Sequence, residues 1–382
     1  MRIVVDENLS LTDYFFAPFG TLSAYPGRGI NAAQLVDAET LLVRSVTKVT
    51  PQLVRDAGEL SASCKQIGFV GSATIGTDHL DVSGLRAMGI TVANAPGCNA
   101  QAVAEYVVSA ILTLQPERAL AKNFRLGIIG LGNVGQRLHQ LATRLGWQVI
   151  GVDPFVTRDA IVQMSLAEML PQVDAVSIHV PLTQDVPDAT YHLIDVDHLT
   201  LMKPTCMLIN SARGAVVAED ALLAEFARSR AAGRPLRQVV LDVFEHEPRI
   251  SSTLLDDLAL ATPHIAGYSL EGKARGTEMI YQAYCAWRGV AAPLTLAGKL
   301  PVMPILFNPR LPLLEQLLQL LHQLYPIQTD DAALRACVEY APGGGIGWVN
   351  AEDFDRLRRD YPLRREWASF GDRSTTGHGA GS

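Results

Sequence analysis

The sequence has few of the features that mark secreted, membrane-spanning or nucleic-acid-binding proteins. Its five cysteines are odd in number and show no CxxC spacing, which favours free thiols in a reducing compartment over a disulfide framework. No uninterrupted apolar stretch approaches the roughly 20 residues that a membrane-spanning helix needs. Acidic residues outnumber basic ones, and the net charge of −7 argues against nucleic acid or an anionic membrane surface as a partner.

The length and the N-terminal residues set the broad class. A chain of 382 residues has room for two or three domains, and a hydrophobic content of 48% is ordinary for a globular enzyme. The first residues, MRIVVDENLS, predict a short strand and an acidic turn rather than a signal peptide, so we expect a cytoplasmic protein.

One stretch, LGIIGLGNVGQRLHQLATRLGWQVIGVDP (126–154), organises the rest of the chain. It predicts a strand, a glycine turn, an amphipathic helix and a second strand that ends at Asp153. Gly130 allows the tight turn, Gly132 lets a pyrophosphate approach the backbone, and Gly135 lets the helix lie close to the strand. Asp153 would accept the ribose hydroxyls of NAD and repel the 2′-phosphate of NADP. The stretch therefore predicts a dinucleotide site.

Apolar runs and helical segments alternate on both sides of this unit. Before it, the alternation predicts a small parallel α/β domain, and after it a completed doubly wound sheet. The runs are 2–5, 41–43, 67–70 and 90–93 before it, and 173–180, 206–209, 238–241 and 258–261 after it. Helices are expected at 99–114, linking the domains, and at 269–287, packing back against the N-terminal domain.

The C-terminal third has a different composition. Residues 289–312 are typical of a linker, whereas Leu313 to Tyr325 is too leucine-rich for an exposed helix. The apolar side chains of this helix must be buried either by its own small domain or by a second subunit, and the pattern does not decide between these two possibilities. Arg356 to Arg365 alternates with aspartates, which favours a solvated or intersubunit face over nucleic-acid binding. The tail 371–382 is expected to be disordered.

The predicted fold is α/β, with two doubly wound parallel-sheet (Rossmann/flavodoxin-like) domains and a small C-terminal α+β domain. We expect a discontinuous substrate-binding domain at 1–97 and 268–289, a nucleotide-binding domain at 98–267 and a C-terminal domain at 290–370.

Three residues near predicted strand ends fit the needs of hydride transfer from a carbon that bears a hydroxyl group. Arg213 can grip a carboxylate with two hydrogen bonds. If Glu247 bonds one ring nitrogen of His264, it fixes the tautomer and favours the charged ring, and the other nitrogen takes the substrate proton. Taken singly, each is better explained as a solvated or structural residue, and Glu245 and His246 are equally eligible by position. Together they predict an active site.

Four motifs in order carry a resemblance to a known family. The GxGxxG-to-Asp unit, Asn-x-x-Arg-Gly, Asp-Val-Phe-x-x-Glu-Pro and Thr-Pro-His-Ile-Ala-Gly resemble the NAD-dependent D-2-hydroxyacid dehydrogenases over about residues 1–288. The resemblance implies NAD as cofactor and Arg213, Glu247 and His264 as catalytic residues. It implies cofactor contacts at Gly130, Gly132, Asn133, Val134, Gly135, Asp153, Val180, Ser211, Ala212, Arg213, Asp242 and Gly267.

Further stretches at 5–8, 43–49, 95–100 and 266–277 are similar to one branch of that family. That branch oxidises a phosphorylated four-carbon sugar acid at C2 in vitamin B6 synthesis, and an extra C-terminal domain mediates its dimer formation. The resemblance therefore implies a homodimer and favours the interface role of Leu313 to Tyr325. It implies substrate contacts at Ser45 and Thr74. Arg44 and Lys48 are the candidates for holding the phosphate, with Tyr268 donating a hydroxyl, and an ordinary surface role for these residues is equally open.

Two other functions stay open. The chain could be a dehydrogenase of another 2-hydroxy acid, such as 3-phosphoglycerate or glyoxylate. It could also be an NAD-sensing binding protein, although a lost Arg, Glu or His would have supported that and all three are present. No metal is expected, because His179, His192 and His198 lack the spacing of metal ligands.

Overall fold

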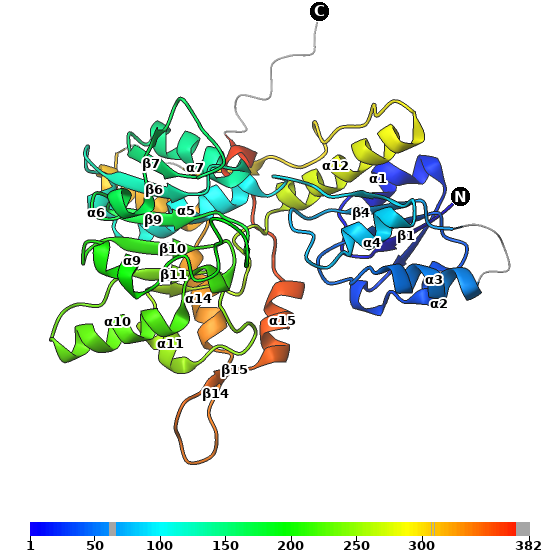
Figure 1. Cartoon of the computed structure of the whole chain (residues 1–382). Coiled ribbons are helices and arrows are strands. Elements are labelled where there is room, and N and C mark those ends of the chain that lie inside the picture. The colour runs from blue at the N-terminus through cyan, green and yellow to red at the C-terminus, as the bar shows by residue number, and fades with distance from the viewer. Residues whose placement is uncertain (61–65, 307, 309, 372–382) are drawn as a thin grey trace, which may run out of the picture. The chain divides into compact units, whose positions relative to one another are not determined.

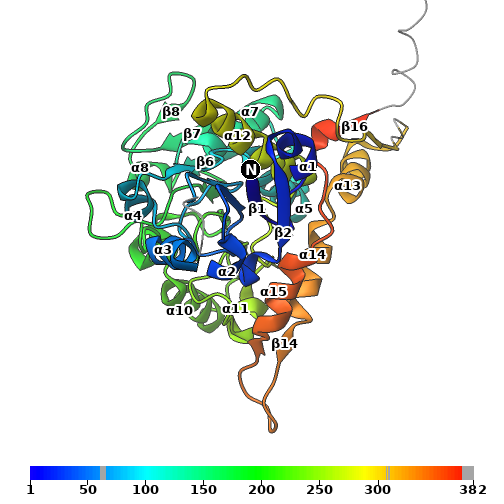
Figure 2. The ribbon, with the colours of Figure 1, turned by 90° about the vertical axis from the view of Figure 1, so that its right-hand side faces the viewer.

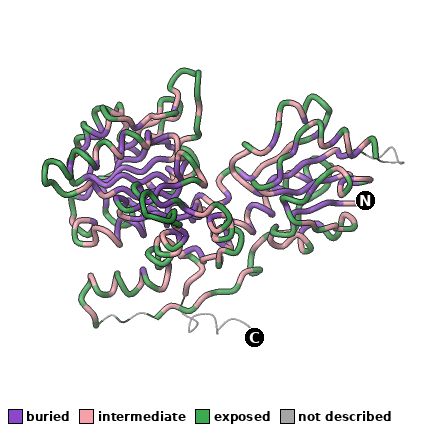
Figure 3. Tube along the Cα trace, turned by 90° about the horizontal axis from the view of Figure 1, so that it is seen from below, coloured by how far each residue is buried: buried purple, intermediate pink, exposed green. Residues whose placement is uncertain are grey.

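The computed structural model describes residues 1–60, 66–306, 308 and 310–371, and the chain divides into two compact units (Figure 1). Unit 1 consists of Met1–Asn99 and Ser269–Val302, and unit 2 of Ala100–Tyr268 and Met303–Ser382. Each unit has its own parallel sheet with buried strands (Figure 3). Cys64 and the predicted tail from residue 372 onward lie outside the described residues.

Unit 1 is built on a five-stranded parallel sheet in the order β2-β1-β3-β4-β5. Four of these strands coincide with predicted apolar runs, whereas the edge strand β2 was not predicted, because its residues are only partly buried. The strands are β1 (Arg2–Asp6), β2 (Thr21–Tyr25), β3 (Thr40–Val43), β4 (Phe69–Ser72) and β5 (Thr91–Ala93). The helices are α1 (Thr12–Phe16), α2 (Ala32–Leu35), α3 (Pro51–Leu60), α4 (Val82–Ala87) and α12 (Leu270–Arg288).

The long helix α12 fastens the second stretch of unit 1 to the first. It begins at Ser269, whose side chain accepts a hydrogen bond from the Gly272 N–H at 2.9 Å. Its Tyr281 and Tyr284 are buried in one cluster with aromatic residues of α1 and β4. At Gly276 an added Cβ would lie 2.7 Å from the carbonyl oxygen of Ala73. The N-terminal half of α12 therefore lies against the loop that follows β4.

Unit 2 is built on a seven-stranded parallel sheet in the order β12-β11-β10-β9-β6-β7-β8. The strand order reverses between β6 and β9, the point at which doubly wound sheets bind ligands. The strands are β6 (Arg125–Ile129), β7 (Gln148–Val152), β8 (Val162–Gln163), β9 (Ala175–Ile178), β10 (Met207–Asn210), β11 (Val239–Leu241) and β12 (Leu260–Ala261). The helices are α5 (Ala100–Leu114), α6 (Pro116–Ala119), α7 (Asn133–Arg144), α8 (Leu166–Met169), α9 (Val196–Leu201), α10 (Glu219–Ala231) and α11 (Ser252–Asp257).

The C-terminal region, Met303–Gly371, is a small α+β structure within unit 2. It contains β13 (Met303–Pro304), α13 (Leu313–Leu324), α14 (Ile327–Arg335), β14 (Val338–Glu339), β15 (Trp348–Val349), α15 (Ala351–Arg359) and β16 (Phe370–Gly371). β14 and β15 are antiparallel, and α14 and α15 lie side by side (Figure 2). Leu334 and Phe354 belong to the same buried cluster as Phe244 and Leu254, so this region shares the core of the seven-stranded sheet.

Candidate active site

The glycine turn after β6 is shaped for a ligand. Gly130 has a φ of +92°, and an added Cβ would lie 2.5 Å from the carbonyl oxygen of His179. At Gly135 an added Cβ would lie 2.1 Å from the Gly130 oxygen, so only glycine lets α7 pack this closely. Gly132 differs, because its added Cβ would meet no protein atom within 4 Å. The packing of the chain does not require glycine at position 132. A pyrophosphate bound at the helix N-terminus would require it, because a side chain there would keep the ligand away from the backbone.

Asp153, at the end of β7, is held in a fixed orientation. Its Oδ2 accepts a hydrogen bond from the Leu131 N–H at 2.8 Å, and its Oδ1 accepts from the Phe155 and Val156 N–H groups at 2.9 and 3.0 Å. A carboxylate has about four acceptor positions, so the side chain retains capacity for a ribose hydroxyl. Asn133 and Val134 form the first turn of α7, where backbone N–H groups lack partners within the helix.

The predicted residues follow neighbouring strands of one parallel sheet. Gly130 follows β6, Val180 follows β9, Arg213 follows β10, Glu247 follows β11 and His264 follows β12. These five strands are adjacent in the order β12-β11-β10-β9-β6. Because the carboxyl ends of parallel strands lie at the same edge, the glycine turn and the three candidate catalytic residues share that edge.

Glu247 and His264 form a pair. The Oε2 atom of Glu247 lies 2.9 Å from Nδ1 of His264, and Oε1 accepts a hydrogen bond from the Phe244 N–H at 2.9 Å. Burial raises the pKa of the Glu247 carboxyl, but the bonds from His264 and the Phe244 N–H outweigh it and leave the pKa below its usual value. The charged carboxylate accepts from Nδ1, which leaves Nε2 as the ring nitrogen that can exchange a proton.

Glu245, which the sequence left equally eligible, has other partners. Its Oε1 lies 2.7 Å from Nε2 of His192, and its Oε2 accepts a hydrogen bond from the Glu219 N–H at 3.0 Å. Glu247 is therefore the carboxylate that pairs with His264.

Asp242 fixes the loop that carries His264 through hydrogen bonds. His264 has a φ of +57°, which is uncommon for a residue other than glycine, and its N–H donates to the Asp242 carbonyl at 2.8 Å. Asp242 is buried, and its Oδ1 accepts from Thr262 Oγ1 at 2.6 Å and from the Ile265 N–H at 2.8 Å. Its Oδ2 accepts from the Ala266 N–H at 2.9 Å. These bonds give Asp242 a positioning task; the cofactor contacts predicted for Asp242 and Gly267 stay predictions.

The loop that carries Arg213 is braced by Asn210. The Asn210 side chain donates to the Arg213 carbonyl at 2.9 Å and accepts from the Ala212 N–H at 3.0 Å. Arg213 itself is half-buried and donates from Nη1 to the Ala212 carbonyl at 2.8 Å. The hydroxyl of Ser211 is buried and has no hydrogen-bond partner within the described part of the chain. A buried hydroxyl without a partner fits the predicted contact of Ser211 with a cofactor.

The predicted substrate residues other than Tyr268 lie in unit 1. Ser45 is exposed and Arg44 half-buried, and both follow β3, the neighbour of β4. Thr74 follows β4, and its hydroxyl lies 2.7 Å from that of Ser72 and donates to the Gly76 carbonyl at 2.9 Å. The three residues therefore share the carboxyl edge of this sheet.

Lys273 is a residue that the sequence reasoning missed. Burial and the nearby charge of Arg44 lower the pKa of the Lys273 ammonium to about 8, against the opposing effect of Asp6. Lys273 lies on the first turn of α12, and Lys48, the residue predicted instead, is exposed. Its one sequence signal is its place within the stretch 266–277. Two cations held close together at a sheet edge are suited to an anion.

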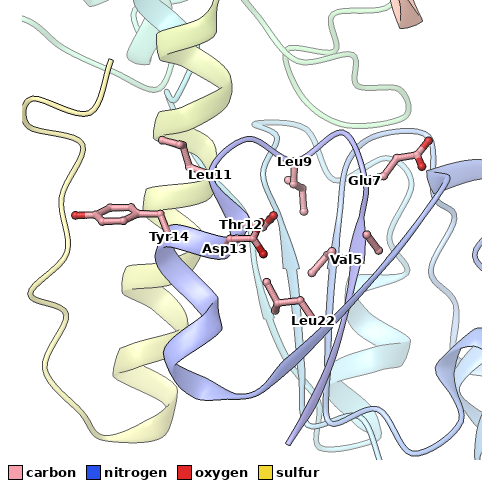
Figure 4. A pocket seen from close by; sticks show the side chains of 9 residues that line it. Val5, Glu7, Leu9, Leu11, Thr12, Asp13, Tyr14 and Leu22 are labelled. Carbon is pink, nitrogen blue, oxygen red and sulfur yellow. The ribbon is translucent and has the colours of Figure 1, made fainter. Parts of the chain in front are cut away.

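The cavity of Figure 4 is a different site. It has a volume of about 600 Å³ and is lined by Val5, Glu7, Leu9, Leu11, Thr12, Asp13, Tyr14, Leu22 and Ala24. None of these residues belongs to the predicted site. Glu7 and Asp13 would repel an anionic sugar acid, so we do not place the substrate there.

The described residues also indicate whether the chain could bind a metal ion or cross a membrane. They contain no group of three or more His, Cys, Asp or Glu side chains placed to hold a metal ion. None of the helices that these residues form has both the length and the apolar character needed to cross a membrane.

Comparison with known proteins defines the class first. Residues 114–266 match the family "D-isomer specific 2-hydroxyacid dehydrogenase, NAD binding domain", and residues 301–375 match a family described only as a domain of unknown function. The fold is similar to that of the TT0316 protein from Thermus thermophilus, with a TM-score of 0.63 and 24% identity over 77% of this chain and 99% of that one. D-lactate dehydrogenase from Aquifex aeolicus, solved with NAD and lactic acid, gives a TM-score of 0.59 and 25% identity over 76% and 96%. The chain is thus an NAD-dependent 2-hydroxyacid dehydrogenase.

The more similar relatives narrow this class. Erythronate-4-phosphate dehydrogenase from Acinetobacter baumannii is 51% identical over 97% of this chain and 99% of its own length. The protein of the same name from Psychrobacter cryohalolentis is 44% identical over 96% and 97%. The chain belongs to the erythronate-4-phosphate dehydrogenase family.

Proposed function

We propose that this chain catalyses the NAD-dependent oxidation of 4-phospho-D-erythronate at C2 to (R)-3-hydroxy-2-oxo-4-phosphooxybutanoate, a step in the synthesis of pyridoxal phosphate (vitamin B6). The family supplies the substrate by its name. The observation that carries the chemistry is the Glu247–His264 pair, 2.9 Å apart, at the sheet edge that also holds Arg213 and the glycine turn.

The proposed roles follow from this arrangement. The C2 hydroxyl gives its proton to Nε2 of His264, and the imidazolium that forms is stabilised by the Glu247 carboxylate on Nδ1. Arg213 holds the substrate carboxylate and the C2 oxygen as that oxygen becomes a carbonyl. NAD, when bound, takes the hydrogen of C2 with its two electrons. Gly132, Ser211 and Asp153 hold the cofactor, and Asp153 selects NAD over NADP.

For the phosphate group we propose Arg44 and Lys273, with Ser45 and Thr74 as further substrate contacts and Tyr268 as a hydroxyl donor. The proximity of two cations at one sheet edge supports the first pair. A dianionic phosphate would relieve the repulsion between them, which an uncharged end of a substrate would not. Lys48, exposed to solvent, is the weaker candidate.

The direct test is NADH formation from purified 4-phospho-D-erythronate, measured beside 3-phosphoglycerate and glycolate, the hydroxy acid that corresponds to glyoxylate. A kcat/KM for 4-phospho-D-erythronate well above the others supports the proposal. Equal or better turnover of another acid would assign the chain to that substrate instead. Binding of NAD without turnover of any acid would favour a nucleotide-sensing protein.

We also propose that the protein is a homodimer joined through α13. Of the leucines on this helix only Leu321 is buried by the chain itself, and Leu313 and Leu318 are 67% and 43% exposed. An apolar face of this kind needs a cover. The double substitution Leu313→Gln/Leu318→Gln should yield monomers in light scattering. Leu201→Gln, a control at 42% exposure on α9, should leave the dimer intact. A double variant that stays dimeric would refute this interface.

A cytoplasmic location is the last part of the proposal. No disulfide joins the described cysteines, Cys98, Cys206, Cys285 and Cys337, to one another, which is typical of proteins in a reducing compartment. Fractionation of cells that express the tagged protein would test it, and recovery with an oxidising compartment would contradict it.

A further inference from the structure

An arginine occupies a core-facing position on helix α15. Phe354 is buried and Leu357 half-buried, so the inner face of this helix follows the usual spacing. Arg358 lies four residues after Phe354, on that same face, where an apolar residue is expected. Arg356 and Arg359, by contrast, are exposed and pair with Asp353 and Asp360. Arg358 is thus half-buried rather than solvated, and the intersubunit alternative stays a prediction.

The backbone around α15 is tied to the loops that carry the candidate catalytic residues. The Val349 N–H donates to the Ile250 carbonyl at 2.9 Å, three residues beyond Glu247. Further along, the Arg364 guanidinium donates to the carbonyls of Ile265 and Tyr268 at 3.1 and 3.2 Å, directly after His264. α15 lies between these two attachments in the sequence, so its inner face is directed to the part of unit 2 that holds Glu247 and Tyr268.

The side chain of Arg358 interacts with both residues, with Tyr268 directly and with Glu247 through its charge. Its guanidinium pairs with the Tyr268 side chain and lies within the electrostatic reach of Glu247 and of Asp355 on its own helix. Its Cζ lies 5.6 Å from the centre of the Phe354 ring. Its Nε is buried and has no hydrogen-bond partner among the residues that the structure describes. Arg358 is half-buried, and a guanidinium partly removed from water is costly unless it is paired, so this position calls for a reason other than packing.

We propose that Arg358 is a positioning residue of the active site, supplied by the C-terminal region, which holds the Glu247 carboxylate and the Tyr268 hydroxyl in place. The C-terminal region then completes the catalytic machinery of its own chain, besides any part in dimer formation. The inference rests on the proposed function, in which Glu247 orients His264 and Tyr268 contacts the substrate.

The test compares Arg358→Gln and Arg358→Lys with Arg359→Gln, which removes an exposed charge from the same helix. All are full-length proteins assayed with whichever 2-hydroxy acid the wild type oxidises best, so a wrong substrate assignment does not affect the comparison. Loss of a charged hydrogen bond in the site should lower kcat/KM by about 10- to 100-fold in Arg358→Gln. Arg358→Lys should recover part of this loss, and Arg359→Gln should match the wild type.

The pH profile separates positioning from mere packing. The titratable groups that face Arg358 are Glu247, Tyr268 and Asp355, and the titratable or charged groups that face Glu247 are His264 and Arg358. Burial alone would raise the pKa of Glu247, and Arg358 is one of the groups that lower it. The acid limb of kcat/KM should therefore move to higher pH in Arg358→Gln. The proposal would be overturned if Arg358→Gln kept the activity and the acid limb of the wild type. It would also be overturned if both Arg358 variants lost activity only because they unfolded or dissociated.

Discussion

Glu247→Gln is the substitution that tests the proposed chemistry most directly. It keeps the shape of the side chain and an oxygen for the Phe244 N–H, but removes the negative charge from the 2.9 Å contact with Nδ1 of His264. A hydrogen bond to a charged group contributes about 1.5–3 kcal/mol. The side chains of His264 and Glu247 are 35% and 21% exposed, so solvent screening places the effect near the lower end. About 1.5 kcal/mol corresponds to a fall of about tenfold in kcat/KM.

The assay is NADH formation under kcat/KM conditions at one pH, with Glu245→Gln as the matched control. Glu245 lies in the same loop and loses the same charge, but it pairs with His192 rather than with His264. We expect the control to stay within about twofold of the wild type, because neither Glu245 nor its partner His192 has a role in the proposed proton transfer. If the two variants were equally active, or if Glu245→Gln were the slower, the assignment of Glu247 as the partner of the catalytic base would fall.

Three further predictions concern the cofactor, the phosphate and the fold. Asp153→Ala should weaken NAD binding and narrow its advantage over NADP, as measured by the ratio of KM values, and an unchanged ratio would remove Asp153 from the ribose site. Because the pKa of Lys273 is lowered to about 8, KM for the phosphorylated acid should rise above that pH in the wild type. Lys273→Arg should abolish this rise, and an identical profile in that variant would exclude Lys273. Burial raises the pKa of Glu105 from 4.5 to about 7. Between these values the unfolded state binds fewer protons than the folded state, so the free energy of unfolding falls as pH rises. Glu105→Gln should remove that slope in urea unfolding at pH 5 and 7.5, whereas an equal slope would refute the assignment.

The local features of the nucleotide-binding unit could be predicted from the sequence because each is written in consecutive residues. The glycine turn requires a positive φ at Gly130, and because glycine adopts that conformation readily, the requirement can be recognised in the sequence. Arg213 and His264 follow short apolar runs that can only be buried strands in a sheet of this kind. Parallel strands then bring the residues after them to one edge, whatever their separation along the chain.

The choice between Glu245 and Glu247 could not be made in this way. Glu245 and Glu247 are only two positions apart in the sequence, and both follow the same strand. The structure decides between them through partners far away in the sequence, since His192 takes Glu245 and His264 takes Glu247. Lys273 was missed for a related reason, because its proximity to Arg44 depends on how α12 packs against the first stretch of unit 1.

The basic residues of the C-terminal region show the same limit most clearly. Alternating charges predict a solvated face, and for Arg356 and Arg359 that prediction holds. Arg364, however, is half-buried and donates to backbone carbonyls, and Arg335 donates to the carbonyls of Leu255 and Leu258. A pattern of charges carries no information about carbonyl groups at other helix and strand ends, which are present in every sequence.

These attachments also change what a truncation would measure. Removing the C-terminal region would take away α13, but it would also strip Arg335 and Arg364 from the carbonyls that they satisfy and expose the core around Phe244 and Leu254. Buried carbonyls without partners are costly, and an opened core adds to that cost. A truncated chain would therefore lose activity whether or not it had lost its dimer. Single substitutions on α13 and α15 address these two tasks separately, because Leu313 and Leu318 are exposed on one helix, whereas Arg358 interacts with Tyr268 from the other.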